Sequence, residues 1–249
     1  MKKRKLITVF SLLFILSSFI FAKDNKANVV CSTSWSASFA ELSGAEDVTV
    51  IAPANLRHPP EYEVTVSDVL SIMNSDYFIY AGFERMMKTL EDNFATSNTI
   101  PIQIKLDNSL ATVTESCMKI AKKIGTEKQC EKNLGEYEKV LKIGKEKVSK
   151  KGLGGAKVLC HKHQVYLAEE LGLDVVATFG PGPVTSKQIV DAKKGNYELI
   201  IDNIHNPVGE PLVEVAENAR YIIWRNFPET VGKNSLINLI KENIDVLLK

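Results

Sequence analysis

The sequence lacks the signatures of several common enzyme and nucleic-acid-binding classes. It has no CxxC pair, no glycine-rich loop able to cradle a phosphate, and no nucleophile–base pairing of the hydrolase kind. No Gly/Ser linker, low-complexity tract or solenoid-length repeat interrupts it. A basic patch is also missing, because the lysines of 145–151 read as one solvated helix face that includes Glu146. Redox, P-loop and repeat architectures are therefore excluded.

The first 22 residues are typical of a secretory signal peptide. Basic residues at 2–5 precede an apolar run at 6–21, and Ala22 offers a small residue before a charged stretch. The run is shorter than the roughly 20 residues a spanning helix needs. Removing 1–22 takes away four positive charges, so the net charge falls from +1 to −3. We expect export to the periplasm or cell surface, and no nucleic-acid partner.

Cysteine is scarce, with four residues in the chain. An oxidising compartment permits disulfides, and four cysteines allow three complete pairings. Cys117 and Cys130 lie on adjoining helical segments, so a bridge is predicted there first. Cys31 and Cys160 lie in strand-like runs and are expected to be small buried side chains.

Short apolar runs alternate with helical periodicity in two blocks. Strands are predicted at 29–33, 48–52, 77–80, 99–106, 156–160, 174–179, 198–202 and 220–224. Helices are predicted at 35–44, 83–89, 110–124, 127–150, 165–171, 186–194, 211–218 and 235–248, and another, capped by Thr65 or Ser67, runs to about Asn74. This order predicts an α/β fold of two lobes, each a parallel sheet flanked by helices, joined by one long helix.

The predicted organisation has four parts. They are a signal peptide (1–22), an N-terminal α/β lobe (23–126), a connecting helix (127–151) and a C-terminal α/β lobe (152–249), whose last helix could pack back on the first lobe. Ligands of open α/β sheets bind at the carboxyl ends of the strands. We therefore expect the ligand site in the interlobe cleft.

Each of the four histidines follows the carboxyl end of a predicted strand, and none lies in a predicted helix. His58 belongs to the first lobe, whereas His161, His163 and His205 belong to the second. Neutral imidazole is a common metal ligand, so a divalent ion held between the lobes would explain this placement. A single loop histidine is more often an ordinary surface residue, which is the competing interpretation.

Carboxylates lie near these histidines. Glu61 shares the loop of His58, and Asp202 precedes His205 by three residues. Either could complete a tetrahedral site or orient an imidazole. Cys160 is a poor candidate ligand beside His161, because adjacent strand residues point to opposite faces.

Several segments resemble the zinc/manganese family of ABC-transporter substrate-binding proteins. Residues 53–68 resemble the family's "His-x-Tyr-Glu-x-x-x-Ser-Asp" loop and helix start, and 74–82 resemble the strand that follows. Residues 161–173 resemble the second-lobe "His-x-Ala-x-x-Tyr…Gly-Leu" segment, and 235–248 resemble the closing helix. The resemblance implies two lobes joined by a rigid helix, three histidines and a carboxylate around zinc or manganese, and docking on a membrane permease.

The sequence departs from this family pattern at three ligand positions. Pro60 stands where the first-lobe histidine lies, with His58 two residues earlier, and Gln103 stands in place of the second histidine. The terminal aspartate maps near Arg225 or Asn226, so only His161 carries over directly. The chain thus resembles a divergent member.

We therefore predict a non-enzymatic, monomeric binding protein that captures a divalent metal ion and delivers it to an ABC permease. The metal is the transported ligand and no catalytic cofactor is expected; histidine-rich coordination favours zinc over manganese. The predicted ligands are His58, Glu61, His161, His205 and Asp202, with His163 and Gln103 as weaker candidates.

Two alternatives remain open. One is a binding protein of the same fold for a metal chelate or small anion, using Arg57 and Arg225. The other is a metal-assisted hydrolase with Glu61 as general base.

Overall fold

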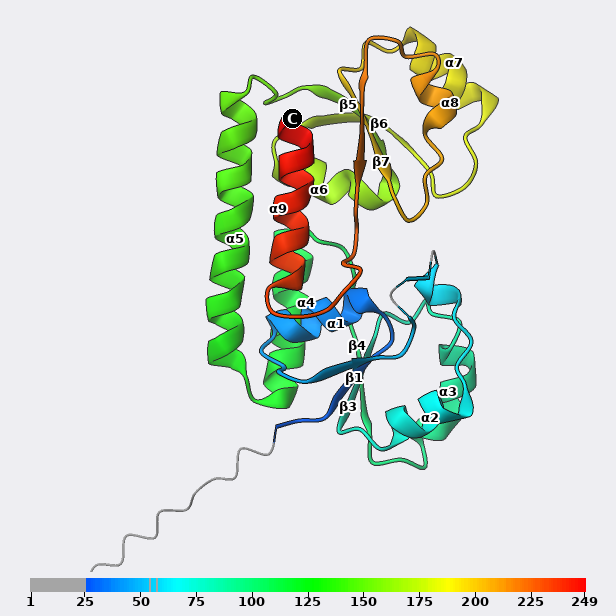
Figure 1. Cartoon of the computed structure of the whole chain (residues 1–249), viewed down its shortest axis with the longest axis vertical. Helices are drawn as coiled ribbons and strands as arrows, with labels where there is room; N and C mark the ends of the chain where they lie inside the picture. Colours follow the sequence, from blue (N-terminus) through cyan, green and yellow to red (C-terminus); the bar gives the residue numbers. More distant parts are fainter. Residues whose placement is uncertain (1–25, 54, 57) are drawn as a thin grey trace, which may run out of the picture.

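The computed structural model describes residues 26–53, 55–56 and 58–249. The chain forms two lobes, the first below the second in Figure 1. The predicted signal peptide lies outside the described residues. None of the helices in the described part combines the length and hydrophobicity that a membrane crossing requires.

The first lobe is built on a parallel four-stranded sheet in the order β2-β1-β3-β4. Its elements are β1 (Val29–Cys31), α1 (Ser34–Leu42), β2 (Val48–Val50), the 3₁₀ turn η1 (Pro59–Glu61), α2 (Val66–Met73), β3 (Tyr77–Tyr80), α3 (Met87–Phe94), β4 (Ile100–Gln103) and α4 (Leu110–Ile124).

The second lobe repeats the design with a parallel sheet in the order β6-β5-β7-β8. Its elements are β5 (Lys157–His161), η2 (Lys162–Gln164), α6 (Val165–Glu170), β6 (Asp174–Phe179), α7 (Ser186–Lys194), β7 (Leu199–Asn203), α8 (Glu210–Val213) and β8 (Arg220–Trp224). The predicted fold class is confirmed. In each sheet the strand order reverses at the central strands, β1/β3 and β5/β7, which is where open α/β sheets bind ligands.

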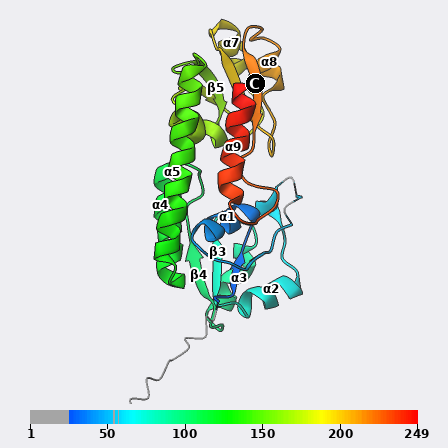
Figure 2. The same ribbon diagram turned by 60° about the vertical axis from the view of Figure 1, so that its left-hand side comes forward.

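Two long helices join the lobes. α5 (Glu127–Lys150) runs along one side of both, and α9 (Ser235–Leu248) lies beside it (Figures 1 and 2). The C-terminal helix α9 also contacts α1 of the first lobe and β8 of the second. One hydrophobic core cluster consequently includes side chains from both sheets, from Val29 and Ile79 to Val158 and Ile201.

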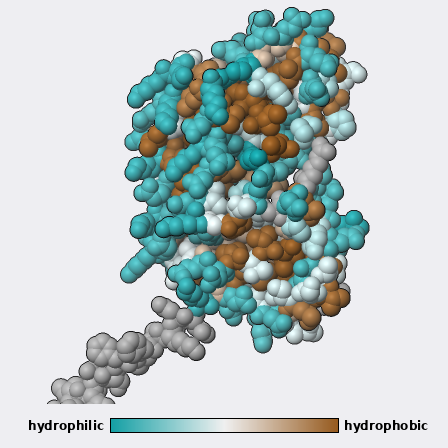
Figure 3. Space-filling view, in the orientation of Figure 1, coloured by the Kyte–Doolittle hydropathy of each residue, from teal (hydrophilic) through white to brown (hydrophobic). Residues whose placement is uncertain are grey.

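The inner face of α5 is buried at three- and four-residue spacing, at Cys130, Leu134, Tyr137, Leu141, Gly144 and Val148. In Figure 3, hydrophilic residues cover the edge of the molecule along α5, whereas apolar residues appear on the viewed face of both lobes. The outward face of α5 is thus solvated, and its inner stripe is the part that joins the lobes.

Gly144 sets how closely α5 approaches α9. A Cβ at Gly144 would lie 2.5 Å from Cδ1 of Ile244 and 2.9 Å from Cδ2 of Leu171, whereas a Cβ at Gly135, in the same helix, meets nothing within 4 Å. We expect Gly144→Leu to lower the free energy of unfolding by about 1–3 kcal/mol through overpacking. The matched Gly135→Leu variant should instead be neutral or gain up to about 1 kcal/mol from helix propensity. Urea unfolding of both variants measures the contrast, and equal effects would contradict this packing.

Two predicted helices differ from the structure by four residues or more at one end. The helix predicted at 83–89 begins only at Met87, because the buried Glu84 carboxylate accepts the N–H groups of Ala81 and Gly82 and holds the preceding residues in a turn. The helix predicted at 211–218 ends at Val213. The β-branched Val213 and Val215 disfavour its continuation.

The predicted bridge between Cys117 and Cys130 is wrong. All four cysteines are free and buried. The Cys117 thiol faces α1, where it donates to the carbonyl oxygen of Phe39 at 3.5 Å. Cys31 and Cys160 are fully buried, as their strand-like surroundings predicted.

Candidate functional site

His161 ends β5 at the strand-order reversal of the second sheet. Its backbone leaves the strand at φ −62° and ψ 135°, and its Nδ1 accepts the N–H of His163 at 3.1 Å, which caps η2. Because Nδ1 is an acceptor, neutral His161 carries its proton on Nε2. Coordination of an ion through Nε2 therefore requires His161 to release this N–H and carry its proton on Nδ1 instead.

The ring of His161 is fully buried. It packs edge-to-face on Phe179, with ring centroids 5.5 Å apart, and a Cβ at Gly180 would lie only 2.3 Å from its Nε2. The segment after β6 can lie against the imidazole because Gly180, at φ +70°, has no side chain. Within the described residues, His161 Nε2 and Oδ1 of Asn206 are both buried without a hydrogen-bond partner.

The histidines of the second lobe are held in the neutral form. Burial lowers the pKa of His161 to about 4, from an ordinary 6.5, and the neighbouring His163, whose ring centroid is 5.1 Å away, lowers it further. Burial also lowers the pKa of the half-buried His205, and partial desolvation lowers the pKa of His163 even though this residue is exposed. Neutral imidazole is the form that coordinates metal ions.

This burial predicts acid-sensitive stability. The His161 imidazole has a pKa of 6.5 in the unfolded chain and about 4 in the folded chain, so between these pH values only the unfolded chain is protonated there. Stability is therefore greatest above pH 6.5 and falls as the pH drops toward 4, by on the order of 3 kcal/mol from this residue. Urea midpoints of the metal-free protein from pH 7.5 to 4.5 measure this loss. A His161→Gln variant should lose much of the slope, and an unchanged slope would contradict the assignment.

Asp202, in the adjacent strand β7, is fully buried and its carboxylate is occupied. Oδ1 accepts the N–H of Asn203 at 2.7 Å, while Oδ2 accepts the N–H of Gly209 at 2.7 Å and the hydroxyl of Tyr221 at 2.8 Å. Both oxygens of this predicted ligand are therefore engaged, and the bonds to Asn203 and Gly209 hold the two ends of the loop that carries His205.

His205 lies in the loop after β7 and is half-buried. Its Nδ1 is 2.7 Å from Oδ1 of Asn226, and its ring stacks on Phe227, with centroids 3.6 Å apart and planes at 12°. With Oδ1 of Asn226 as the acceptor, Nδ1 carries the proton and Nε2 keeps a free lone pair. Of the predicted histidine ligands, this one has the tautomer that coordination through Nε2 requires.

His58 comes from the first lobe, at the start of η1, and is exposed. Burial is the main cause of the lowered pKa of His205; the nearby Arg225 and His58 lower it further, whereas Asn226 and Glu229 oppose this shift. The structure thus brings one histidine of each lobe within electrostatic range, and His161 and His163 form a second pair.

The other predicted ligands lie less favourably. Glu61 and His163 are exposed. Gln103 ends β4, and its Nε2 donates to the carbonyl of Ala81 at 3.1 Å. Arg57, which an anion site would use, lies outside the described residues. In the described part of the chain, no three His, Cys, Asp or Glu side chains are grouped closely enough to hold a metal ion.

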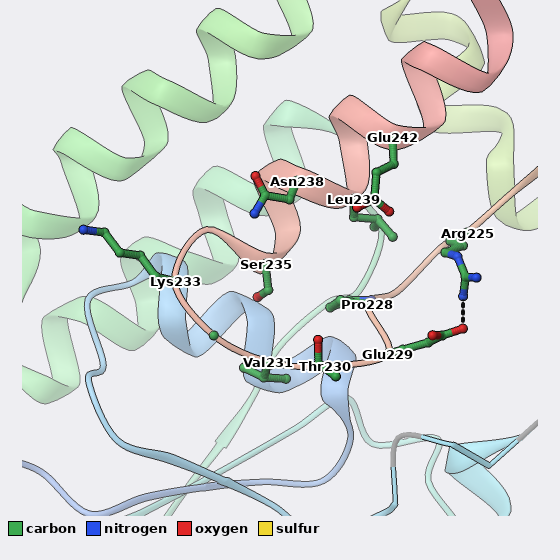
Figure 4. A pocket seen from close by; sticks show the side chains of 11 residues that line it. Arg225, Pro228, Glu229, Thr230, Val231, Lys233, Ser235, Asn238, Leu239 and Glu242 are labelled. Atoms are coloured by element: carbon green, nitrogen blue, oxygen red, sulfur yellow. Dashed lines mark hydrogen bonds and ion pairs between the residues drawn. The ribbon is translucent and has the colours of Figure 1, made fainter. Parts of the chain in front are cut away.

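A cavity of about 350 Å³ lies next to this region, between the segment after β8 and helix α9 (Figure 4). Arg225 and Glu229 form an ion pair at its edge, and Ser235, Asn238 and Glu242 line it. None of the four histidines lines this cavity, so it is separate from the histidine pairs.

The sequence places Gly180 in a turn after the strand at 174–179, but it does not reveal that Phe179 and Gly180 lie against the imidazole of His161 or that Phe227 stacks on that of His205. Sequence reasoning placed the family's terminal aspartate near Arg225 or Asn226, but it did not foresee that the Asn226 side chain contacts His205. The position of Asn226 and Phe227 could have indicated this contact, because they follow β8, which pairs with β7, the strand that leads to His205.

The chain has the two-lobed fold of substrate-binding proteins. No protein-family model and no curated protein matches the sequence. Among solved structures, it is similar to the laminin-binding protein Lbp of Streptococcus pyogenes, at 18% identity and a TM-score of 0.67, covering 89% of this chain and 97% of that one.

Two further structures share this architecture. The SBP FpvC from Pseudomonas aeruginosa, in complex with Mn²⁺, is 15% identical with a TM-score of 0.69, and the match covers 90% of this chain and 98% of that one. The laminin-binding protein Lmb of Streptococcus agalactiae, described as having adhesin and metal-transporting activity, is 18% identical with a TM-score of 0.68, over 89% and 98% of the two chains. At these identities the likeness establishes the fold.

Proposed function

We propose that this protein is an extracytoplasmic substrate-binding protein that captures a divalent metal ion and delivers it to an ABC permease. The observation that carries the proposal is that His161 ends β5 and His205 lies two residues after β7, while His58 of the first lobe lies close enough to His205 to affect its pKa. Structural neighbours bound to Mn²⁺ and Zn²⁺ support it.

The proposed ligands are His58, His161 and His205, with Glu61 as the carboxylate; His163 and Gln103 stay secondary. Asp202 is proposed to act indirectly, by holding the His205 loop. Assembly of the site needs a local rearrangement, in which the exposed His58 loop closes on His205 and His161 turns its Nε2 toward the ion. Zinc is favoured because the donors are mainly nitrogen.

Purified protein should bind one divalent ion per chain. Equilibrium dialysis against ZnCl₂ or MnCl₂, followed by elemental analysis, measures the stoichiometry and orders the two metals. The expected result is one ion per chain, with Zn²⁺ bound more tightly than Mn²⁺. Absence of stoichiometric binding of either ion would contradict the proposal.

A second candidate is a protein of this fold that takes a metal chelate or small anion. The observation that favours it is Arg225, whose positive charge acts on His205. In this case dialysis against the free ion would give sub-stoichiometric binding that an anionic chelator restores. A hydrolase with Glu61 as base would need that exposed carboxylate to reach a metal-bound water, and turnover of ester substrates by the zinc-loaded protein would identify it.

A further inference from the structure

Asn108 is a fully buried residue at the boundary between the lobes, just before α4. Its Oδ1 accepts the indole N–H of Trp35 at 2.8 Å. Its Nδ2 donates to the hydroxyl oxygen of Tyr166 at 3.1 Å and to the carbonyl oxygen of Asn226 at 2.9 Å. The orientation of this amide is fixed, because the indole can only donate and the carbonyl can only accept.

These partners come from both lobes. Trp35 lies in α1 of the first lobe, whereas Tyr166 lies in α6 and Asn226 follows β8 in the second. The connecting helix takes part as well, since the hydroxyl of Tyr137 donates to the backbone carbonyl of Asn108 at 2.5 Å. The single buried residue Asn108 thus joins both lobes through its side-chain amide and the connecting helix through its backbone carbonyl.

Two consecutive residues link this boundary to His205. Asn226, whose carbonyl is held by Asn108, uses its side chain to contact Nδ1 of His205. Phe227 stacks on the His205 ring and also contacts the Trp35 ring, with centroids 6.0 Å apart. Two routes therefore connect Trp35 of the first lobe with the His205 imidazole: hydrogen bonds through Asn108 and Asn226, and ring contacts through Phe227.

We propose that Asn108 and Trp35 are positioning residues that set the tautomer and orientation of His205 across the lobe boundary. They act through Asn226 and Phe227, which keep the proton on Nδ1 and leave the Nε2 lone pair available to a divalent cation. The readiness of His205 to coordinate then depends on the contact between the lobes. The link to ion affinity rests on the proposed function, whereas the positioning itself does not.

The test compares wild-type protein with Asn108→Asp and Trp35→Phe. Asn108→Asp keeps an acceptor for the indole but removes the donor to Asn226, and Trp35→Phe removes the donor to Asn108. Side-chain ¹⁵N chemical shifts of the metal-free protein report the tautomer of His205, which a His205→Gln spectrum assigns. We expect mainly the Nδ1–H form in the wild type and a mixture of tautomers in both variants. Zn²⁺ affinity in titrations with ZnCl₂ should fall by about 10- to 100-fold.

Tyr137→Phe is the matched control. It removes a hydrogen bond to the backbone of Asn108 and leaves the side-chain amide untouched, so the His205 tautomer should stay as in the wild type. Unchanged His205 shifts in the folded variants would overturn the positioning role, and if one variant fails to fold the other decides. A wild-type chain that binds no Zn²⁺ would contradict the proposed function instead, and the ¹⁵N shifts would still decide the positioning.

Discussion

Replacing His161 with alanine is expected to abolish stoichiometric metal binding. His161 is the ligand position that carries over directly from the family resemblance, and it ends β5 where the strand order of the second sheet reverses. Because loss of a partner that only orients a ligand typically costs 10- to 100-fold in affinity, loss of the ligand itself should cost at least about 100-fold. Equilibrium dialysis with elemental analysis measures the bound ion.

The adjacent His163 provides the matched control. It is exposed, and it contacts His161 through its backbone N–H, which an alanine retains. His163→Ala should therefore bind metal with an affinity within about tenfold of wild type, as expected if His163 is at most a secondary ligand. Wild-type stoichiometry in a folded His161→Ala protein would reject His161 as a ligand, and a loss in His163→Ala alone would exchange the two roles.

Replacing Asp202 with alanine is expected to destabilise the metal-free protein severely. The substitution leaves the buried N–H of Gly209 and the half-buried hydroxyl of Tyr221 without their acceptor, in addition to the N–H of Asn203. Because hydrogen bonds to a charged group contribute about 1.5–3 kcal/mol each and their losses do not add fully, we expect a loss of about 3–5 kcal/mol. Urea unfolding in the presence of a chelator measures this loss.

Two comparison variants test whether the carboxylate itself is responsible. Tyr221→Phe removes one of the three donors and should cost about 1–2 kcal/mol. Asp191, whose carboxylate is exposed and paired with Lys187 on α7, should tolerate alanine with a loss below about 1 kcal/mol. If Asp202→Ala kept its stability but lost metal binding, Asp202 would be a direct ligand and its structural role would be refuted.

The sequence was sufficient to predict most of the architecture. The strands at 174–179 and 220–224 and the helices at 110–124, 127–150 and 235–248 match the structure residue for residue, because apolar periodicity and glycine punctuation determine such elements locally. The sequence could not predict that the Cys117 thiol points toward α1 and not toward Cys130, since the direction of a side chain on a helix surface depends on which element packs against it.

The site was predictable only in part, for a similar reason. Placement of the histidines at strand ends follows from the α/β topology, which the sequence pattern reveals. The contact between Asn108 and Asn226 joins residues 118 positions apart in the chain. No local pattern specifies it, because it arises from the way two lobes dock. The use of Asp202 as a hydrogen-bond acceptor likewise depends on Gly209 and Tyr221, which the fold brings to it from other elements.

The bracing of both lobes by α5 and α9 has a consequence for transport. Because one hydrophobic core is continuous through these helices and both sheets, separating the lobes like a hinged clamshell would break the interior of the protein rather than a weak seam. In the proposed function, loading and release of the ion would then depend on the short loops that follow the strands, such as those around His58 and Gly180. A membrane partner would obtain the ion by displacing these loops, while the two sheets and the helices that join them keep their arrangement.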